Sequence, residues 1–289
     1  MKKPKVIVIL GQTATGKSDL AVKIAKKVKG EIISADSRQV YTGLDIGTGK
    51  ITEKEMKGIP HHLLDVANPK RKFTVFQYKK LAEEKIIEII ARGNIPIICG
   101  GTGFYVDAIT KGTIFPEVPP NNKLRKVLEK KSSTELFKIL QKFDRARAKD
   151  IKDKNEQNNK VRLIRAIEIA KALGKVPPIT QTTPVYKFIK IGLYLPPNIL
   201  KKKIEKRVKR MFHPPTGEGL LNEIKKLKKS GISEKRLKEF GFEYDNPTEE
   251  KVTSETFKYA QRQMTWFKRD KGIKWFATLN ENKIFDLLS

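Results

Sequence analysis

KVIVILGQTATGKS, residues 5 to 18, joins a run of apolar residues to a glycine-rich loop. The run KVIVIL has the length and the β-branched composition of a buried strand. The loop satisfies the pattern G-x-x-x-x-G-K-[ST] in full, and Lys17 begins a segment with the apolar spacing of a helix. A strand, this loop and a helix in that order predict a phosphate-binding loop inside an α/β domain.

Such a loop binds phosphate through its backbone N–H groups and the positive end of the helix that follows. Lys17 adds a fixed positive charge, and the Ser18 hydroxyl is a candidate ligand for Mg²⁺. The alternative is a glycine turn with a capping serine, but the correct flanks on both sides favour phosphate binding. The predicted loop residues are Gly11, Gln12, Thr13, Ala14, Thr15, Gly16, Lys17 and Ser18.

The alternation of strand and helix continues through the first hundred residues. Short apolar strands separated by helices imply a parallel sheet with helices on its faces, and such sheets bind ligands at the carboxyl ends of their strands. We therefore expect the loops that carry Gly11, Asp36 and Gly100 to converge. The expected strands are 5–10, 31–36, 61–66 and 95–101, and the expected helices are 17–29 and 74–91.

A different pattern begins near Pro116. From residue 121 to about residue 173 the sequence predicts helices with dense charge, and FIKIGLYL, residues 188–195, predicts a further strand. The expected fold is α/β, with a P-loop NTPase-like parallel sheet core and an all-helical insertion domain. The expected parts are residues 1–115 for the first part of the core, 116–187 for the insertion, and 188–289 for the return to the core. Helices at 199–211, 219–230 and 248–268 and a last strand at 274–279 complete the prediction.

The charge balance indicates an anionic partner. The chain has 61 Lys and Arg against 32 Asp and Glu, a formal net charge of +29. Such a field favours nucleic acid or an anionic surface, although solvated helical faces such as KKKIEKRVKR account for part of it.

The cysteine and histidine content limits the chemistry. Cys99 is the only cysteine, which excludes an internal disulfide and a four-cysteine metal site and fits a reducing cytoplasm. The histidines have no ligand spacing, so we expect no metal beyond Mg²⁺. No apolar stretch reaches the length that spans a bilayer, so we expect no membrane partner.

Two residues at strand ends are candidates to act on a substrate. Asp36 should face the phosphate site, where it could hold Mg²⁺ through water or act as a general base; the alternative is a turn aspartate. Thr102 in GGTGFY offers a hydroxyl beside glycines that permit close approach, or it could cap the next helix. Asp65 is the nearest match to a Walker-B aspartate, but we assign it no role because the predicted strand before it is short.

Two further segments carry arginines. Arg162 and Arg165 lie three residues apart and so share a helix face. Lids that close over a bound phosphate carry arginines in this pattern, but exposed helices carry it too. Near the C-terminus, KYAQRQMTWFKR interleaves cations with aromatic residues, as stacking surfaces for nucleic acid do. The helical spacing instead favours Tyr259, Trp266 and Phe267 as core residues. It leaves Gln261, Arg262 and Lys268 as outward contacts.

Eight stretches, in this order, extend over nearly the whole chain: GQTATGKS, DSRQVYTGLDIGTGK, PHHLLDV, PIICGGTGFY, NNKVRLIRAIEI, IEKRVKRM, FGFEY and YAQRQMTWF. Together they resemble the tRNA dimethylallyltransferases, also called tRNA isopentenyltransferases, and the second stretch is far more specific than the phosphate loop. That family transfers a dimethylallyl group from dimethylallyl diphosphate to the N6 amine of the adenine at tRNA position 37, next to the anticodon.

The resemblance implies roles for particular residues. The phosphate loop would bind the diphosphate of an isoprenoid, and Asp36 matches the general base that contacts the exocyclic amine. Thr13 matches a threonine beside that base, and Arg207 matches an arginine that holds the diphosphate with Lys17 and Ser18. The resemblance implies tRNA contacts at Asp36, Ser37, Arg38, Gln39, Thr102 and Arg125, and the charge pattern adds Arg162, Arg165 and Arg262.

The resemblance also implies partners and leaves more than one activity open. The insertion matches the helical domain that clasps the anticodon arm of tRNA, and we expect a monomer of the bacterial type, without the zinc-finger extension of eukaryotic members. An adenylate isopentenyltransferase that acts on free AMP would form the same bond. A small-molecule P-loop kinase and a non-catalytic RNA-binding protein also remain open as interpretations of the sequence.

Overall fold

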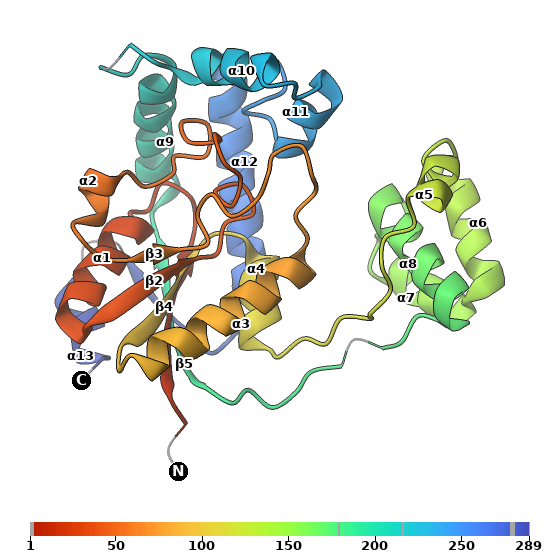
Figure 1. Cartoon of the computed structure of the whole chain (residues 1–289), viewed down its shortest axis with the longest axis horizontal. Helices are drawn as coiled ribbons and strands as arrows, with labels where there is room; N and C mark the ends of the chain where they lie inside the picture. The colour runs from red at the N-terminus through yellow and green to blue at the C-terminus, as the bar shows by residue number, and fades with distance from the viewer. Residues whose placement is uncertain (1–2, 179, 216, 278–280, 289) are drawn as a thin grey trace. The chain divides into compact units, whose positions relative to one another are not determined.

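The computed structural model describes residues 3–178, 180–215, 217–277 and 281–288 and divides into two compact units. The first unit comprises Met1–Gly112 and Thr183–Ser289, and the second comprises Thr113–Thr182 (Figure 1). The second unit begins and ends a few residues earlier than the predicted insertion, 116–187. The reason is that Thr113 forms a β-bridge with Gln181, and the Ile114 N–H donates to Thr180 O (3.0 Å).

The core of the first unit is a parallel sheet, whose six strands within the described residues have the order β3-β2-β4-β1-β5-β6. This arrangement confirms the predicted α/β class. The predicted last strand extended to residue 279, but residues 278 and 279 lie outside the described part. The strands are β1 Lys5–Gly11, β2 Gly30–Ser34, β3 His61–His62, β4 Ile95–Gly100, β5 Lys187–Tyr194 and β6 Ile273–Ala277.

Strand β3 is shorter than the predicted strand 61–66. The chain leaves the extended conformation at Leu63, with a φ of 61°, and again at Asp65, with a φ of 56°. A left-handed residue cannot continue a sheet ladder, so the apolar composition of HHLLDV was misleading there. The Leu63 side chain is nevertheless buried in the core of the unit.

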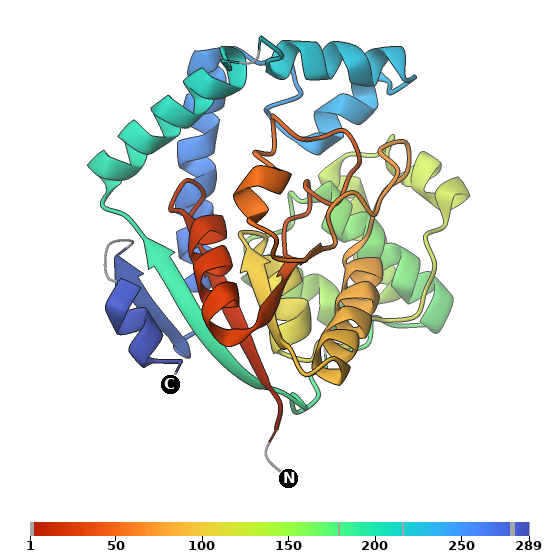
Figure 2. The same cartoon turned by 60° about the vertical axis from the view of Figure 1, so that its left-hand side comes forward.

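Helices cover both faces of the sheet (Figures 1 and 2). Successive side chains of a strand point to opposite faces, so Val6, Val8 and Leu10 pack in one core cluster, whereas Ile7 and Ile9 pack in another with residues of α1. The sequence did not predict the short helices α2, α11 and α13. The helices are α1 Lys17–Val28, α2 Glu53–Met56, α3 Val75–Ala91, α4 Gly103–Thr110, α9 Pro197–Phe212, α10 Leu220–Lys229, α11 Glu234–Phe240, α12 Glu249–Phe267 and α13 Glu281–Asp286.

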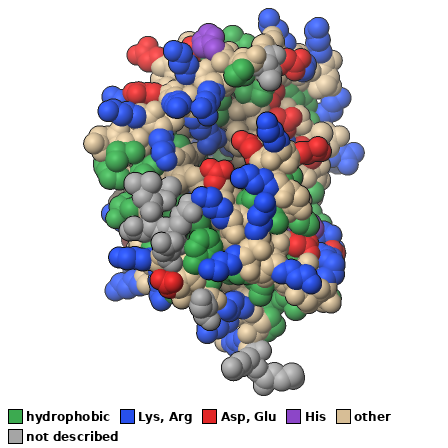
Figure 3. Space-filling model, turned by 90° about the vertical axis from the view of Figure 1, so that its left-hand side faces the viewer, with side chains coloured by type: hydrophobic (Ala, Val, Ile, Leu, Met, Phe, Trp, Pro, Cys, Tyr) green, Lys and Arg blue, Asp and Glu red, His purple; other side chains and the backbone are tan. Residues whose placement is uncertain are grey.

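Helices α9 and α12 pack against each other through apolar stripes. The stripe of α9 has the helical spacing Leu200, Ile204 and Val208, and it meets Val252 and Ala260 of α12. The opposite face of α9 is exposed and basic, as KKKIEKRVKR predicted, and Figure 3 shows that Lys and Arg side chains extend over much of one side of the molecule. The exposed lysines of α9 are Lys201, Lys202, Lys203, Lys206 and Lys209.

The second unit is helical, as predicted, with a core that includes Leu136, Leu140, Ile151 and Leu163. A side-chain oxygen accepts a backbone N–H at the start of each of its helices, which satisfies a donor that the helix leaves unpaired. These helices are α5 Asn122–Leu128, α6 Ser133–Phe143, α7 Arg145–Asp153 and α8 Lys160–Leu173. Among the described residues of the chain, no helix is both long and apolar enough to cross a membrane.

Candidate active site

The loop between β1 and α1 depends on glycine. Gly11 has a φ of 132°, and a Cβ there would lie 2.1 Å from the Leu193 carbonyl oxygen. Gly16, with a φ of 83°, is the N-cap of α1. Ala14 also adopts a left-handed conformation, with a φ of 61°. The loop thereby brings the N-terminus of α1, with its unpaired N–H groups, to the wall of a cavity.

Apart from Gly11, the predicted loop residues divide into two groups. Thr13, Ala14, Gly16, Lys17 and Ser18 line the cavity. Gln12 and Thr15 are buried instead and stabilise the loop itself, because Thr15 Oγ1 donates to Gln12 O (2.7 Å) and Gln12 Oε1 accepts from the Leu195 N–H (3.4 Å).

Lys17 is the charged group of the loop. Its Nζ donates to Gln12 O at 2.6 Å. Burial, together with the neighbouring Arg207 guanidinium, lowers the pKa of Lys17 to about 8, while the Asp36 carboxylate opposes the shift. A bound anion would stabilise the charged form of this amine and raise its pKa again.

We expect the binding of pyrophosphate to make the protein take up protons near pH 8. At that pH the amine of Lys17, with a pKa of about 8, is partly neutral, and a bound anion draws a proton onto it. The affinity for pyrophosphate should therefore fall as the pH rises through 8. Calorimetry in buffers of different ionisation enthalpy measures the uptake. Lys17→Arg, whose guanidinium stays charged, is the control for protons exchanged by pyrophosphate itself. Equal proton uptake in both proteins would contradict the prediction.

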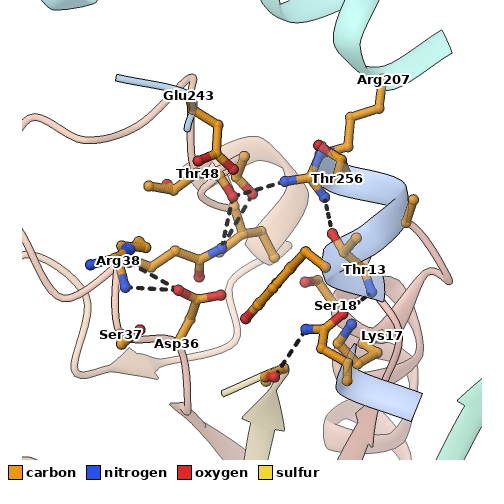
Figure 4. Close-up of a pocket in the computed structure, with 18 of the residues that line it drawn as sticks. Thr13, Lys17, Ser18, Asp36, Ser37, Arg38, Thr48, Arg207, Glu243 and Thr256 are labelled. Carbon is orange, nitrogen blue, oxygen red and sulfur yellow. Dashed lines mark hydrogen bonds between the residues drawn. The ribbon is translucent and has the colours of Figure 1, made fainter. Parts of the chain in front are cut away.

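Asp36 follows β2 and faces the same cavity (Figure 4). Its Oδ1 accepts from the backbone N–H groups of Arg38 (2.8 Å) and Gln39 (3.4 Å), as a turn aspartate does. Its Oδ2 has no hydrogen-bond partner in the part of the chain that the structure describes. The two interpretations of Asp36 are therefore compatible: one oxygen holds the turn, and the other remains available to a substrate.

The segment around Asp36 is tied to the end of β4. Thr102 Oγ1 accepts from the Ser37 N–H at 3.0 Å and donates to Ser37 Oγ at 3.3 Å. Thr102 is the N-cap residue of α4, but its side chain makes no capping bond. It is not among the residues that line the cavity, whereas Ser37, Arg38 and Gln39 are. Thr102 therefore holds the Asp36 segment in place through Ser37, without lining the cavity itself.

Arg207 joins the phosphate loop to the segment DIGTGK. It lies on α9, and its Nη1 donates to Thr13 Oγ1 (3.2 Å) while its Nη2 donates to Thr48 O (2.9 Å; Figure 4). A Cβ at Gly49 would lie 2.4 Å from Nη2, so a glycine at this position leaves room for the guanidinium. The Arg207 guanidinium is poorly solvated, and this burial lowers its pKa, while the Asp36 carboxylate opposes the shift.

A buried carboxylate holds the segment that receives Arg207. Glu223 on α10 accepts from the N–H groups of Asp45 (2.8 Å), Ile46 (2.6 Å) and Gly47 (3.1 Å). It also accepts from the Tyr244 hydroxyl at 2.9 Å. Because four donors satisfy this carboxylate, its burial does not destabilise the fold, and its hydrogen bonds hold the loop in place. No motif or spacing in the sequence identified Glu223 as a residue of the site.

Lys17, Asp36 and Arg207 line one cavity of about 530 Å³, which lies wholly within the first unit. The phosphate loop lies on one side, and the Asp36 segment lies on the other (Figure 4). Gly100 also lines the cavity, so the predicted convergence of the loops after β1, β2 and β4 is confirmed. Arg262 is exposed at this cavity, with its guanidinium 5.9 Å from the ring centroid of Tyr259.

The prediction that the aromatic residues of α12 belong to the core was correct for Phe267, which is buried, and partly correct for Trp266, which packs against the core, but not for Tyr259. Tyr259 lines the cavity, and burial raises its pKa to about 12. Trp266 is half-buried and donates from Nε1 to Asp107 Oδ2 (3.1 Å). The reason is the helical register: the buried stripe of α12 is Val252, Thr256, Ala260, Gln263 and Phe267, and Tyr259 lies one position beside it.

Glu243 is a second carboxyl group at the cavity that the sequence analysis did not identify. Burial raises its pKa to about 7, against the opposing effect of the Arg38 and Arg207 guanidinium groups. The Asp36 carboxylate contributes to the rise. Near neutral pH this group therefore exists in both forms.

Glu243→Gln is expected to stabilise the protein at pH 8 and to have little effect below pH 4.5. A carboxyl group with a raised pKa contributes stability below its unfolded pKa, and that contribution is lost as the pH rises through the folded pKa, here about 7. The gain at pH 8 should be about 3 kcal/mol, because the pKa rises from 4.5 to about 7. Urea unfolding across this pH range measures it. Glu250→Gln, at an exposed position, is the control, and a pH-independent difference would refute the raised pKa.

The arginines predicted in the insertion are held by acidic partners inside the second unit. Arg125 donates from Nε and Nη2 to the buried carboxylate of Glu168, at 2.7 and 2.6 Å. Arg165 contacts the same carboxylate at 3.3 Å. Arg162 pairs with Glu156, and burial lowers the pKa of Arg162. Their contacts with tRNA remain predictions, and each of these arginines also has a structural role.

The fold and the cavity together define a P-loop α/β protein with a carboxylate that faces its phosphate loop. The family model described as IPP transferase matches residues 39–270, and the chain belongs to this family.

Named relatives agree with this assignment and confirm the resemblance. The chain is 37% identical to a tRNA dimethylallyltransferase of Staphylococcus epidermidis over 95% of this chain and 87% of the relative. It is also 37% identical to one of Carboxydothermus hydrogenoformans, over 96% and 93%.

Solved structures show the same fold. A tRNA isopentenylpyrophosphate transferase of Bacillus halodurans superposes with a TM-score of 0.69 at 34% identity, over 99% of this chain and 94% of that one. A eukaryotic dimethylallyltransferase acting on tRNA gives a TM-score of 0.77 at 25% identity, over 97% and 75%.

Proposed function

We propose that this protein transfers the dimethylallyl group of dimethylallyl diphosphate to the N6 amine of the adenine at position 37 of tRNA, and releases diphosphate. One observation carries the proposal: a single cavity holds a phosphate loop with Arg207 on one side and an available oxygen of Asp36 on the other. The names of the relatives support tRNA as the acceptor.

The donor side of the cavity suits a diphosphate leaving group. Negative charge develops on the diphosphate as its bond to the prenyl carbon breaks, and fixed positive groups stabilise that charge. The loop N–H groups, Lys17 and Arg207 would be these positive groups. The Thr13 hydroxyl accepts from Arg207 Nη1, so its own proton remains available to donate to an oxygen of the diphosphate.

The acceptor side suits an aromatic amine, which is a weak nucleophile. As the N6 nitrogen forms its bond to the prenyl carbon, Asp36 Oδ2 would take the proton that the nitrogen loses. Asp36 Oδ1 stays bonded to the Arg38 N–H, so the carboxylate keeps its orientation during the transfer. An adenine stacked in an anticodon loop cannot reach this cavity, so it has to leave the stack first.

Mg²⁺ fits this site as a partner of the diphosphate. The Ser18 hydroxyl lines the cavity and makes no hydrogen bond within the described residues. In the same residues no group of three or more His, Cys, Asp or Glu could hold a metal. Ser18 would therefore share the ion with diphosphate oxygens and water, as Mg²⁺ commonly requires. The bound ion would neutralise part of the diphosphate charge.

The charge of the chain suits RNA as the partner. The net charge of +29, the exposed lysines of α9 and Arg262 at the cavity offer cations to phosphate groups. The helical second unit would clasp the anticodon arm, and one chain would suffice for the reaction.

A transfer assay tests the proposal. Labelled dimethylallyl diphosphate is incubated with an anticodon stem-loop that carries adenine at position 37, with the same RNA carrying guanine there, and with AMP. We expect label in the first RNA alone. Label in AMP alone would identify an adenylate isopentenyltransferase. Phosphate transfer from ATP without prenyl transfer would identify a kinase, and RNA binding without transfer would identify a binding protein.

A further inference from the structure

A glutamine on the buried stripe of α12 connects two loops of the site. Gln263 is 5% exposed and occupies a position where the helical spacing calls for an apolar side chain. Its Oε1 accepts from the Thr13 N–H at 2.8 Å, and its Nε2 donates to Gly101 O at 2.9 Å. One partner is a donor and the other is an acceptor, so the orientation of the amide is determined.

The backbone around this glutamine is shaped to admit it. A Cβ at position 101 would lie 2.2 Å from Gln263 Nε2, so glycine allows the close approach at the end of β4. A buried amide without partners would destabilise the fold, but both polar ends of this one are bonded. A methionine would fill the same space without these bonds, so the space alone does not account for a glutamine here.

The bonds continue from Gln263 to the reacting groups. Thr13, whose N–H is held by Gln263, accepts from Arg207 Nη1 through its side chain, and Arg207 Nη2 donates to Thr48 O. A series of four hydrogen bonds thus links Gly101, Gln263, Thr13, Arg207 and Thr48. A displacement of Thr13 would move its hydroxyl and the guanidinium together.

We propose that Gln263 is the positioning residue of Thr13: it holds the threonine so that its hydroxyl and Arg207 meet the diphosphate of the donor. This inference rests on the proposed function. Gln263 also lines the cavity, but both polar atoms of its side chain are bonded to Thr13 and Gly101, so it would act through Thr13 and not on the substrate directly. Its loss should lower the rate of transfer more than the affinity for either substrate, since a small misplacement of a group affects the transition state most.

A double-mutant cycle tests this inference. Gln263→Met should lower kcat about 10–100-fold while the dissociation constants for pyrophosphate and for the stem-loop change less than about threefold. Thr13→Val removes the hydroxyl through which Gln263 acts. In that background Gln263→Met should cost less than about threefold in kcat, because residues that act as a unit are not additive. Equal costs in both backgrounds would overturn the proposal.

A conservative variant and a control complete the design. Gln263→Glu keeps an acceptor for the Thr13 N–H and should retain more of the rate than Gln263→Met. If Gln263→Met does not fold, Gln263→Glu takes its place in the cycle, and additive costs again overturn the inference. Thr265→Val, at an exposed position of α12, should keep the wild-type rate. Absence of transfer by the wild-type protein would refute the proposed function itself, so the two failures are distinguishable.

Discussion

Asp36→Asn is expected to lower kcat for prenyl transfer about 10²–10⁴-fold, while the affinity for the anticodon stem-loop changes less than about threefold. Asparagine can still accept from the Arg38 and Gln39 N–H groups through Oδ1, so the turn after β2 should persist. The atom that faces the cavity changes from a carboxylate oxygen to an amide NH₂. That group cannot accept the proton of the N6 amine.

Single-turnover kinetics with saturating stem-loop RNA separate this effect from binding. Asp36→Ala is the companion variant, because it removes the acceptor of the turn as well as the base. A similar loss of rate in both variants, with RNA binding retained at least in Asp36→Asn, would show that the base is the main contribution. Wild-type turnover in Asp36→Asn would exclude the general-base role.

Arg207→Lys is expected to lower kcat about 10²–10³-fold even though the charge is kept. The guanidinium holds two partners at once, Thr13 Oγ1 and Thr48 O, from its two terminal nitrogens. The lysine side chain is shorter and ends in a single ammonium group, which cannot donate to both partners in the geometry of the guanidinium. The leaving diphosphate would lose a preorganised donor, and Thr13 would lose its link to the DIGTGK segment.

Arg210→Lys is a matched control, since Arg210 is exposed on the same helix. At saturating RNA it should keep the wild-type kcat. The variants are compared by single-turnover kinetics and by pyrophosphate affinity. If Arg207→Lys lowers affinity for pyrophosphate without lowering kcat, Arg207 contributes to binding of the donor and not to stabilisation of the leaving group.

Much of the fold follows from local sequence patterns. The strand KVIVIL, the glycine loop and the helix after it depend on neighbours within a few residues, and all three formed as predicted. The stripe of α9 was equally visible, because its apolar residues recur with the helical period. Strand β3 was the exception, since the conformations of Leu63 and Asp65 depend on contacts that composition does not reveal.

The site residues that were missed bind partners far away in the chain. Glu223 holds a segment 178 residues before it, and Gln263 holds the N–H of a residue 250 positions away. A weak signal existed for Gln263: it is a polar residue on a helix stripe that is otherwise mostly apolar, and such a residue needs a partner. Glu243 offered none, because its raised pKa results from burial in a cavity formed by several loops.

By itself the sequence determined that a phosphate loop begins an α/β domain, because that motif is contiguous and its glycines permit the backbone conformation of the loop. It also identified the family, through motifs that extend over the whole chain. Only the tertiary structure decided that Thr13 and Arg207, 194 residues apart, form one hydrogen-bonded pair beside Asp36. The packing of α9 on α12 produces that proximity, and it depends on apolar contacts between distant segments. The same packing distinguished Tyr259, at the cavity, from Phe267, in the core.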